Sequence, residues 1–123
     1  MPSDQDLAAF IRSTFRSVWS LELVSLMARE GDRGWERAEL VAALRASDLI
    51  VDRAIDELTI AGVLLLDGAG QACLRPASAD LKALVDASTA FYVRSPDKVR
   101  RIIITGATTG LTAFADAFRI RKD

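Results

Sequence analysis

The chain has 123 residues, of which 50% are hydrophobic and 27% charged, and its formal net charge is −1. This length and composition are those of one globular domain with its own core, so residues 1–123 are expected to form a single domain. There is no histidine and only one cysteine, which excludes catalytic triads built on histidine and any intramolecular disulfide. The N-terminus lacks a signal-peptide pattern and no apolar run approaches roughly 18 residues, so we expect a cytoplasmic protein without a membrane span.

The first third of the chain predicts helices. Ser3 is placed to cap a helix, and apolar residues recur with helical spacing through residue 18. A second apolar stripe follows, so residues 4–30 form either one long helix, kinked between Ser17 and Ser20, or two helices in succession. Gly31 is expected to end this region. Residues 36–47 then predict a short helix that buries Leu40, Val41 and Leu44.

The middle of the chain predicts a helix and a hairpin. Ser47 is a natural N-cap for a helix over residues 48–61. An inward stripe runs along this helix and consists of Val51, Ile55 and Leu58. Two short apolar strands flank the glycine-rich turn at residues 67–70, which is typical of a β-hairpin.

The C-terminal part predicts three more helices. The pattern of residues 78–94 is amphipathic, and Ser95-Pro96 starts another helix with proline at its first position. That helix is expected to bury Val99, Ile102 and Ile103. Residues 106–110 predict a turn, and residues 111–122 a last helix.

The order of elements in residues 18–75 resembles a winged helix-turn-helix domain. The resemblance is carried by ELVAALRASDLIVDRAIDELTIAGVLLLDGAG, in which a short helix leads through a tight turn into a second helix. That second helix ends in the pattern Leu58-x-x-x-Gly62-Val63 and a hairpin follows, as in bacterial regulators of the MarR and PadR type. The resemblance implies a mainly α fold with a small β-hairpin wing and additional N- and C-terminal helices. It also implies a non-catalytic transcription regulator, with a homodimer built through the flanking residues 4–17 and 79–119.

The resemblance makes residues 48–61 the helix that would enter a DNA major groove. The side chains suited to contacting DNA near it are Arg37, Arg45 and Arg53, with Gln71 of the wing able to reach a groove. The same helix carries several carboxylates on its outward side, and DNA phosphates repel carboxylates. Its surface is therefore poorly suited to DNA.

A protein-protein interaction module is the alternative function. Leu49 and Ile50 are two large apolar side chains at the start of a solvent-facing helix, which invites a protein partner. Either such a partner covers them, or the first or the C-terminal helix of the same chain does. The candidate partner-binding residues are Asp48, Leu49, Ile50, Asp52 and Asp56. Whether the partner is DNA or a protein stays open.

Charge is distributed unevenly along the chain. Residues 47–67 carry a formal charge of −4, whereas residues 94–123 carry +4. The second region contains the cluster Arg94, Lys98, Arg100 and Arg101. This cluster is either a solvated helix face or a binding surface for phosphate, for an acidic protein or for the acidic helix of a second copy.

Nothing in the sequence predicts an enzyme, so we nominate no catalytic residue, cofactor or metal site. The absence of histidine removes the commonest metal ligand and general base. Residues 102–110 resemble the opening of a short-chain dehydrogenase, but Thr112 stands where the nucleotide loop needs its third glycine. Cys73 lies in a predicted strand, where a small buried hydrophobe is expected.

Overall fold

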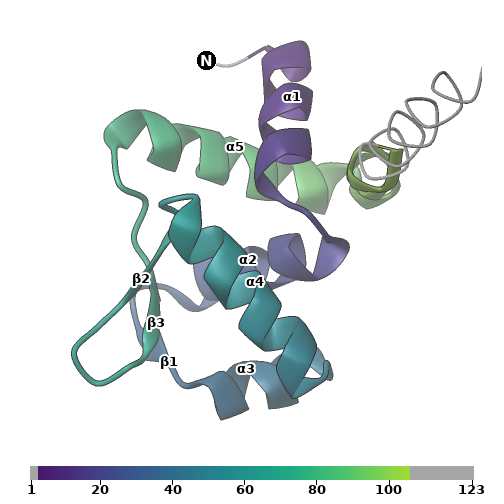
Figure 1. Cartoon of the computed structure of the whole chain (residues 1–123). Coiled ribbons are helices and arrows are strands. Elements are labelled where there is room, and N and C mark those ends of the chain that lie inside the picture. The colour runs from purple at the N-terminus through teal and green to yellow at the C-terminus, as the bar shows by residue number, and fades with distance from the viewer. Residues whose placement is uncertain (1–2, 106–123) are drawn as a thin grey trace, which may run out of the picture.

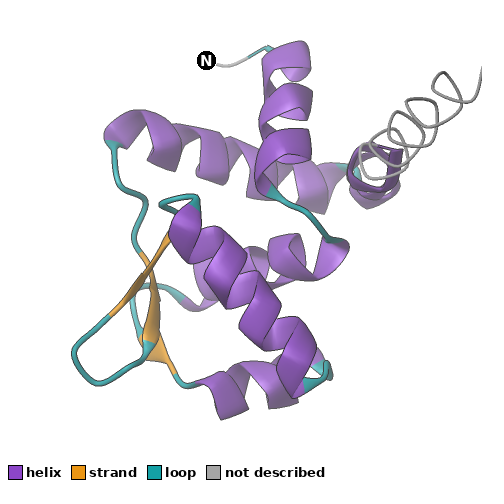
Figure 2. Cartoon of the chain, viewed as in Figure 1, coloured by secondary structure: helices purple, strands orange, loops and turns teal. Residues whose placement is uncertain are grey.

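The computed structural model describes residues 3–105, which are mainly helical with one small antiparallel sheet (Figures 1 and 2). In chain order the elements are α1 (Asp4–Thr14), α2 (Val18–Glu30), β1 (Gly34–Trp35), α3 (Arg37–Leu44), α4 (Asp48–Ile60), β2 (Leu64–Leu66), β3 (Ala72–Leu74) and α5 (Ala79–Arg94). A further helix starts at residue 96 and is still helical at residue 105. The turn and helix predicted after residue 105, with the cations of the tail, lie outside the described residues.

The first 30 residues form two helices, so the second of the two alternatives is confirmed. The break comes from a reciprocal cap at the start of α2. The Ser17 hydroxyl accepts the N–H of Ser20 at 3.3 Å, and the Ser20 hydroxyl accepts the N–H of Ser17 at 3.4 Å. Such a capping box satisfies two N–H groups that a helix N-terminus otherwise leaves unpaired. The buried ring of Phe15 fixes the chain where α1 ends.

The sheet has the order β1-β3-β2, with both pairs antiparallel. The hairpin of β2 and β3 confirms the prediction for residues 63–74. Strand β1 was not predicted, because two residues are too short to show an alternating pattern. It is nonetheless held firmly to β3, since Gly34 lies opposite Cys73 and Trp35 opposite Ala72. Cys73 itself is half-buried, a lesser burial than expected.

A tight turn joins α3 to α4. Arg45 ends α3 in a left-handed backbone conformation with φ 55°, and its N–H donates to the carbonyl of Val41. Two residues later the Ser47 hydroxyl accepts the N–H of Ile50 at 3.2 Å, so it caps α4 as predicted. Of the three residues expected to be buried in α3, Leu40 is buried whereas Val41 and Leu44 are half-buried. The turn thus sets α3 and α4 across one another at the lower end of the molecule in Figure 1.

The core joins all the helices through one set of buried apolar side chains. The predicted inward residues of α4 are fully or nearly fully buried and pack against α2: Val51, Ile55 and Leu58. At the other end, α1 lies across α5 (Figure 1) and buries Leu7 and Ile11. Val99 and Ile103 of the helix that starts at residue 96 are buried as predicted, and Ile102 is half-buried. Among the described residues, no helix has the length and hydropathy needed to cross a membrane.

Candidate functional site

The outward side of α4 presents a continuous stripe to solvent. Leu49, Arg53, Asp56 and Ile60 follow one another at intervals of four, three and four residues, which places them on one face of the helix. All four are exposed. Leu49 is 59% exposed and Ile60 is 87% exposed. The stripe therefore has a large aliphatic group near each end and charged groups between them.

The two apolar residues at the start of α4 have different surroundings. Within residues 3–105, neither α1 nor any other element covers Leu49, and the C-terminal helix that was the other candidate to cover it lies outside the described residues. Ile50 is half-buried, so the prediction that it is exposed is only partly right. Its neighbour Asp52 is also half-buried, while Asp48 and Asp56 are exposed as predicted.

The charge of α4 is negative. It carries four carboxylates and one guanidinium, a formal charge of −3. One of the four, Asp52, lies 3.1 Å from the guanidinium of Arg37 on α3. Arg37 and Arg53 are two of the cations predicted to contact DNA, and Arg37 is paired with a carboxylate of its own chain. Arg53 takes part in none of the ion pairs found among residues 3–105.

The remaining two residues predicted to contact DNA lie apart from the stripe. Arg45 is exposed at the turn between α3 and α4. Gln71 is half-buried against β1: a Cβ atom built on Gly34 would stand 2.5 Å from the Gln71 side-chain oxygen. The structure thus holds Gln71 beside the sheet.

The tip of the hairpin is closed by a carboxylate. One oxygen of Asp67 accepts the N–H groups of Ala69 and Gln71, each at 2.9 Å. No cation occurs in residues 67–70. Beside this turn, β2 exposes Leu65 and Leu66. The hairpin therefore offers apolar groups and a carboxylate, and nothing that attracts phosphate.

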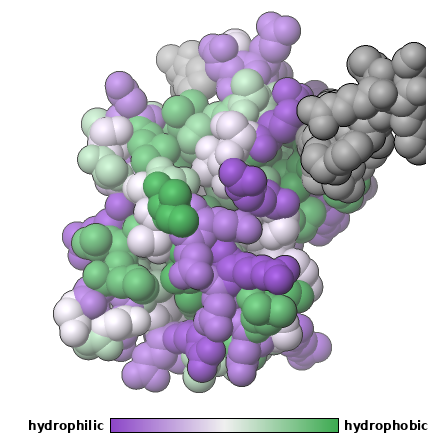
Figure 3. Space-filling model, viewed as in Figure 1, coloured by the Kyte–Doolittle hydropathy of each residue, from purple (hydrophilic) through white to green (hydrophobic). Residues whose placement is uncertain are grey.

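Seen in space-filling form, the side of the molecule that carries α4 is mixed. Figure 3 shows a hydrophilic band across the middle of this side, with hydrophobic patches over the hairpin and to either side of the band. The exposed large apolar residues of this region are Leu49, Ile60, Leu65 and Leu66. We call Asp48, Leu49, Asp52, Arg53, Asp56 and Ile60 the α4 surface; its three carboxylates outnumber its one guanidinium.

A second charged cluster joins three helices on another part of the molecule. The hydroxyl of Tyr92 on α5 donates to a carboxylate oxygen of Glu22 on α2. Arg100, on the helix that starts at residue 96, lies 3.9 Å from the same Glu22 oxygen, and its guanidinium lies 5.5 Å from the centre of the Tyr92 ring. Burial raises the pKa of the Tyr92 phenol, and the hydrogen bond to Glu22 raises it further. This cluster fixes the packing of helices that are far apart in sequence, so its role is structural.

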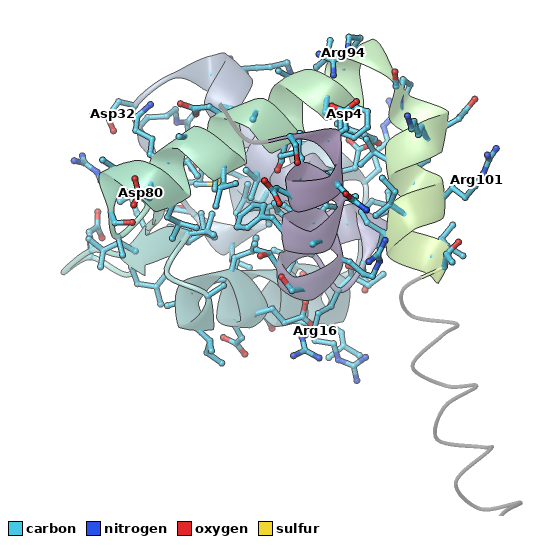
Figure 4. The ribbon with its side chains drawn as sticks, turned by 90° about the horizontal axis from the view of Figure 1, so that it is seen from above. Asp4, Arg16, Asp32, Asp80, Arg94 and Arg101 are labelled. Carbon is cyan, nitrogen blue, oxygen red and sulfur yellow. The ribbon has the colours of Figure 1, made fainter. Side chains whose placement is uncertain are left out.

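The other basic residues of this region point outward. Figure 4 shows Arg94 at the end of α5 and Arg101 on the next helix, both directed away from the body of the molecule. Arg94 and Lys98 lie 5.2 Å and 5.7 Å from the centre of the Phe91 ring. These distances are those of cation–π contacts, which hold both side chains near the surface of α5.

A cleft of 480 Å³ lies between α2, β3 and α5 and has an apolar floor that includes Met27, Leu74 and Val85. Its charged rim is paired internally: Arg75 with Asp32 at 3.2 Å, and Lys82 with Asp86 at 2.7 Å. Because these charges already have partners, the described residues that line the cleft provide no unpaired charged group for a ligand. Within residues 3–105, no group of three acidic or cysteine side chains is placed to hold a metal ion.

Comparisons of the chain with protein-family models, with curated proteins and with solved structures found no match.

Proposed function

We propose that this chain is a non-catalytic winged-helix protein, of the type used by bacterial transcription regulators, whose α4 surface binds another protein. The order α2, β1, α3, α4, β2, β3 and the sheet order β1-β3-β2 support the winged-helix assignment. In this assignment α3 and α4 are the helix-turn-helix pair and the β2–β3 hairpin is the wing.

One observation favours a protein over DNA as the partner. The outward face of α4 exposes two large aliphatic side chains, Leu49 and Ile60, among carboxylates. DNA-binding helices need cations for phosphates and Arg, Lys, Asn or Gln for base edges. A protein surface with aliphatic side chains and with Lys or Arg would complement the α4 surface, because it could bury the aliphatic side chains and pair with the carboxylates. Burying the exposed parts of Leu49 and Ile60 would contribute about 3 kcal/mol to such a complex.

A residue-specific crosslink in the cells that make the protein tests this function. A photo-crosslinking amino acid replaces Leu49 in one variant and Ala83, an exposed residue of α5, in the matched control. We expect the position-49 variant to form adducts with protein, and the control to form far fewer. Adducts to DNA alone, or equal protein adducts at both positions, would contradict the proposal.

DNA binding is the second candidate, favoured by the resemblance and by the exposed guanidinium groups of Arg45 and Arg53. It predicts salt-dependent binding of the purified chain to duplex DNA at low ionic strength. Replacing Arg53 by alanine would then remove about one phosphate contact. The slope of the logarithm of the binding constant against the logarithm of salt concentration should become shallower by about one. Fluorescence anisotropy with labelled duplexes measures both quantities, and a flat titration of the wild-type chain excludes this candidate.

A further inference from the structure

A second surface of the molecule is the opposite of the α4 surface in charge. It consists of Val93, Arg94, Lys98, Arg101 and Ile104, which we call the basic surface. Lys98, Arg101 and Ile104 are spaced by three residues and therefore lie on one side of their helix. Val93 is 72% exposed and Ile104 is 58% exposed. Both surfaces thus combine charges of one predominant sign with large exposed aliphatic side chains.

The three cations of the basic surface have no carboxylate partner in the part of the chain that the structure describes, although Arg94 and Lys98 lie over the Phe91 ring. The ion pairs found among residues 3–105 include none with Arg94, Lys98 or Arg101. Their neighbour Arg100 behaves differently, because it pairs with Glu22 of α2 and with the exposed Asp97 of its own helix. The cations that face solvent are therefore available to an acidic partner.

We propose that a second copy of this chain is the partner of the α4 surface, and that it presents its basic surface. This inference rests on the proposed function, since it names the occupant of the same site. The carboxylates Asp48 and Asp56 pair with the cations of the other copy, while Leu49 and Ile60 pack against its Val93 and Ile104.

The basic surface of a copy pairs with the α4 surface of another copy and not with its own. In Figure 1 α4 crosses the front of the lower half, whereas the helix that starts at residue 96 lies at the upper right, and Figure 4 also shows them apart. Each copy therefore offers one acidic and one basic surface. Two copies that exchange both contacts form a closed dimer, and copies that exchange one contact at a time form an open chain.

Sedimentation velocity of the full chain tests the inference. Wild-type protein should associate in about 0.1 M salt and dissociate in about 1 M salt, because the Debye length falls from roughly 10 Å to roughly 3 Å. Asp56→Lys and Arg101→Glu should each weaken association about tenfold. Glu30→Lys and Arg12→Glu make the same charge changes on exposed residues of α2 and α1, and should leave association unchanged. Circular dichroism melts establish that all four variants fold.

An equimolar mixture of the two interface variants is the decisive sample. Asp56→Lys retains the basic surface and Arg101→Glu retains the acidic one, so their wild-type surfaces can pair. The altered residues are also complementary to each other. The mixture should associate more strongly than either variant alone, and a mixture no stronger than its components overturns the inference.

The two proposals fail in different ways. If the wild-type chain is monomeric in low salt while position 49 crosslinks to a different protein, the self-association inference is overturned and the proposed function stands. A position-49 adduct with twice the mass of the chain supports both. Absence of any protein adduct at position 49 overturns both.

Discussion

The guanidinium of Arg37 lies 3.1 Å from the carboxylate of Asp52, across the turn between α3 and α4. Arg37 is one of the residues that the sequence suggests for DNA, and Asp52 is one that it suggests for a protein partner. The contact pairs a residue predicted to contact DNA with one predicted to bind a protein, and it neutralises both charges. It therefore lowers the number of cations on this side of the molecule that phosphate could use.

The Arg37–Asp52 pair is expected to contribute little to stability. Both side chains are about half exposed, at 54% and 46%, and exposed pairs typically contribute between 0.2 and about 1 kcal/mol because water and salt screen them. A double-mutant cycle with Arg37→Ala and Asp52→Ala should give a coupling in this range that decreases with added salt. A coupling above about 2 kcal/mol would show that the pair is far better ordered than its exposure indicates.

The Tyr92 hydroxyl should titrate above its ordinary pKa of about 10. The folded state holds this proton more tightly than the unfolded state, so the protonated phenol contributes to the free energy of unfolding. This contribution is fully present below about pH 10 and is lost as pH rises through the pKa of the folded state. Tyr92 is the only tyrosine in the chain, so the phenolate absorbance reports it alone. Its titration midpoint in the folded protein should exceed that in denaturant.

Tyr92→Phe provides the matched control for this titration. Removing the hydroxyl leaves Glu22 without its α5 partner and should lower the free energy of unfolding by about 1 kcal/mol at neutral pH. The variant should also lose less stability than wild type between pH 9 and 11. Equal losses for both proteins would show that neither burial nor the hydrogen bond to Glu22 raises the pKa of the phenol in the folded protein.

Leu49 and Leu58 should respond very differently to truncation, although both are leucines of α4. Leu58 is completely buried, so Leu58→Ala should lower the free energy of unfolding by about 2–5 kcal/mol. Leu49 is mostly exposed, and Leu49→Ala should change stability by less than about 0.5 kcal/mol. Urea denaturation measures both values. A large loss for Leu49→Ala would place this residue in the core and remove the basis of the proposed function.

The N-cap of α4 should contribute about 1 kcal/mol to the free energy of unfolding. Ser47→Ala removes the hydroxyl that accepts the N–H of Ile50, whereas Ser47→Asn keeps an acceptor at the same position. The alanine variant is therefore expected to unfold at lower urea concentration than wild type, with the asparagine variant close to wild type. If both variants lose the same stability, the hydroxyl contributes through something other than capping.

The sequence predicted those parts of the fold that depend on local patterns. Ser47, the stripe of Val51, Ile55 and Leu58, and the glycine-rich turn each act over a few residues, and α4 and the hairpin were found where they indicated. Strand β1 was missed because its two residues acquire their conformation from β3, which lies almost 40 residues further along the chain.

The candidate site was predictable only in part, for the same reason. Leu49 and the carboxylates of α4 are visible from helical spacing alone. The pairing of Arg37 with Asp52 depends on how α3 crosses α4, and the contact of Tyr92 with Glu22 joins residues 70 positions apart. Such contacts follow from tertiary packing, which single-sequence patterns do not encode.

Strand β2 lies at an edge of the sheet, because β3 occupies the centre. Exposed sheet edges with apolar side chains are sites at which chains aggregate by adding strand to strand. Here the edge strand has only three residues, and the carboxylate of Asp67 follows it directly. Aggregation through this edge would depend on backbone hydrogen bonds and would therefore respond little to salt. The pairing of the charged helices weakens as salt is added, because salt screens exposed charges. The salt dependence of any assembly therefore identifies which part of the molecule forms it.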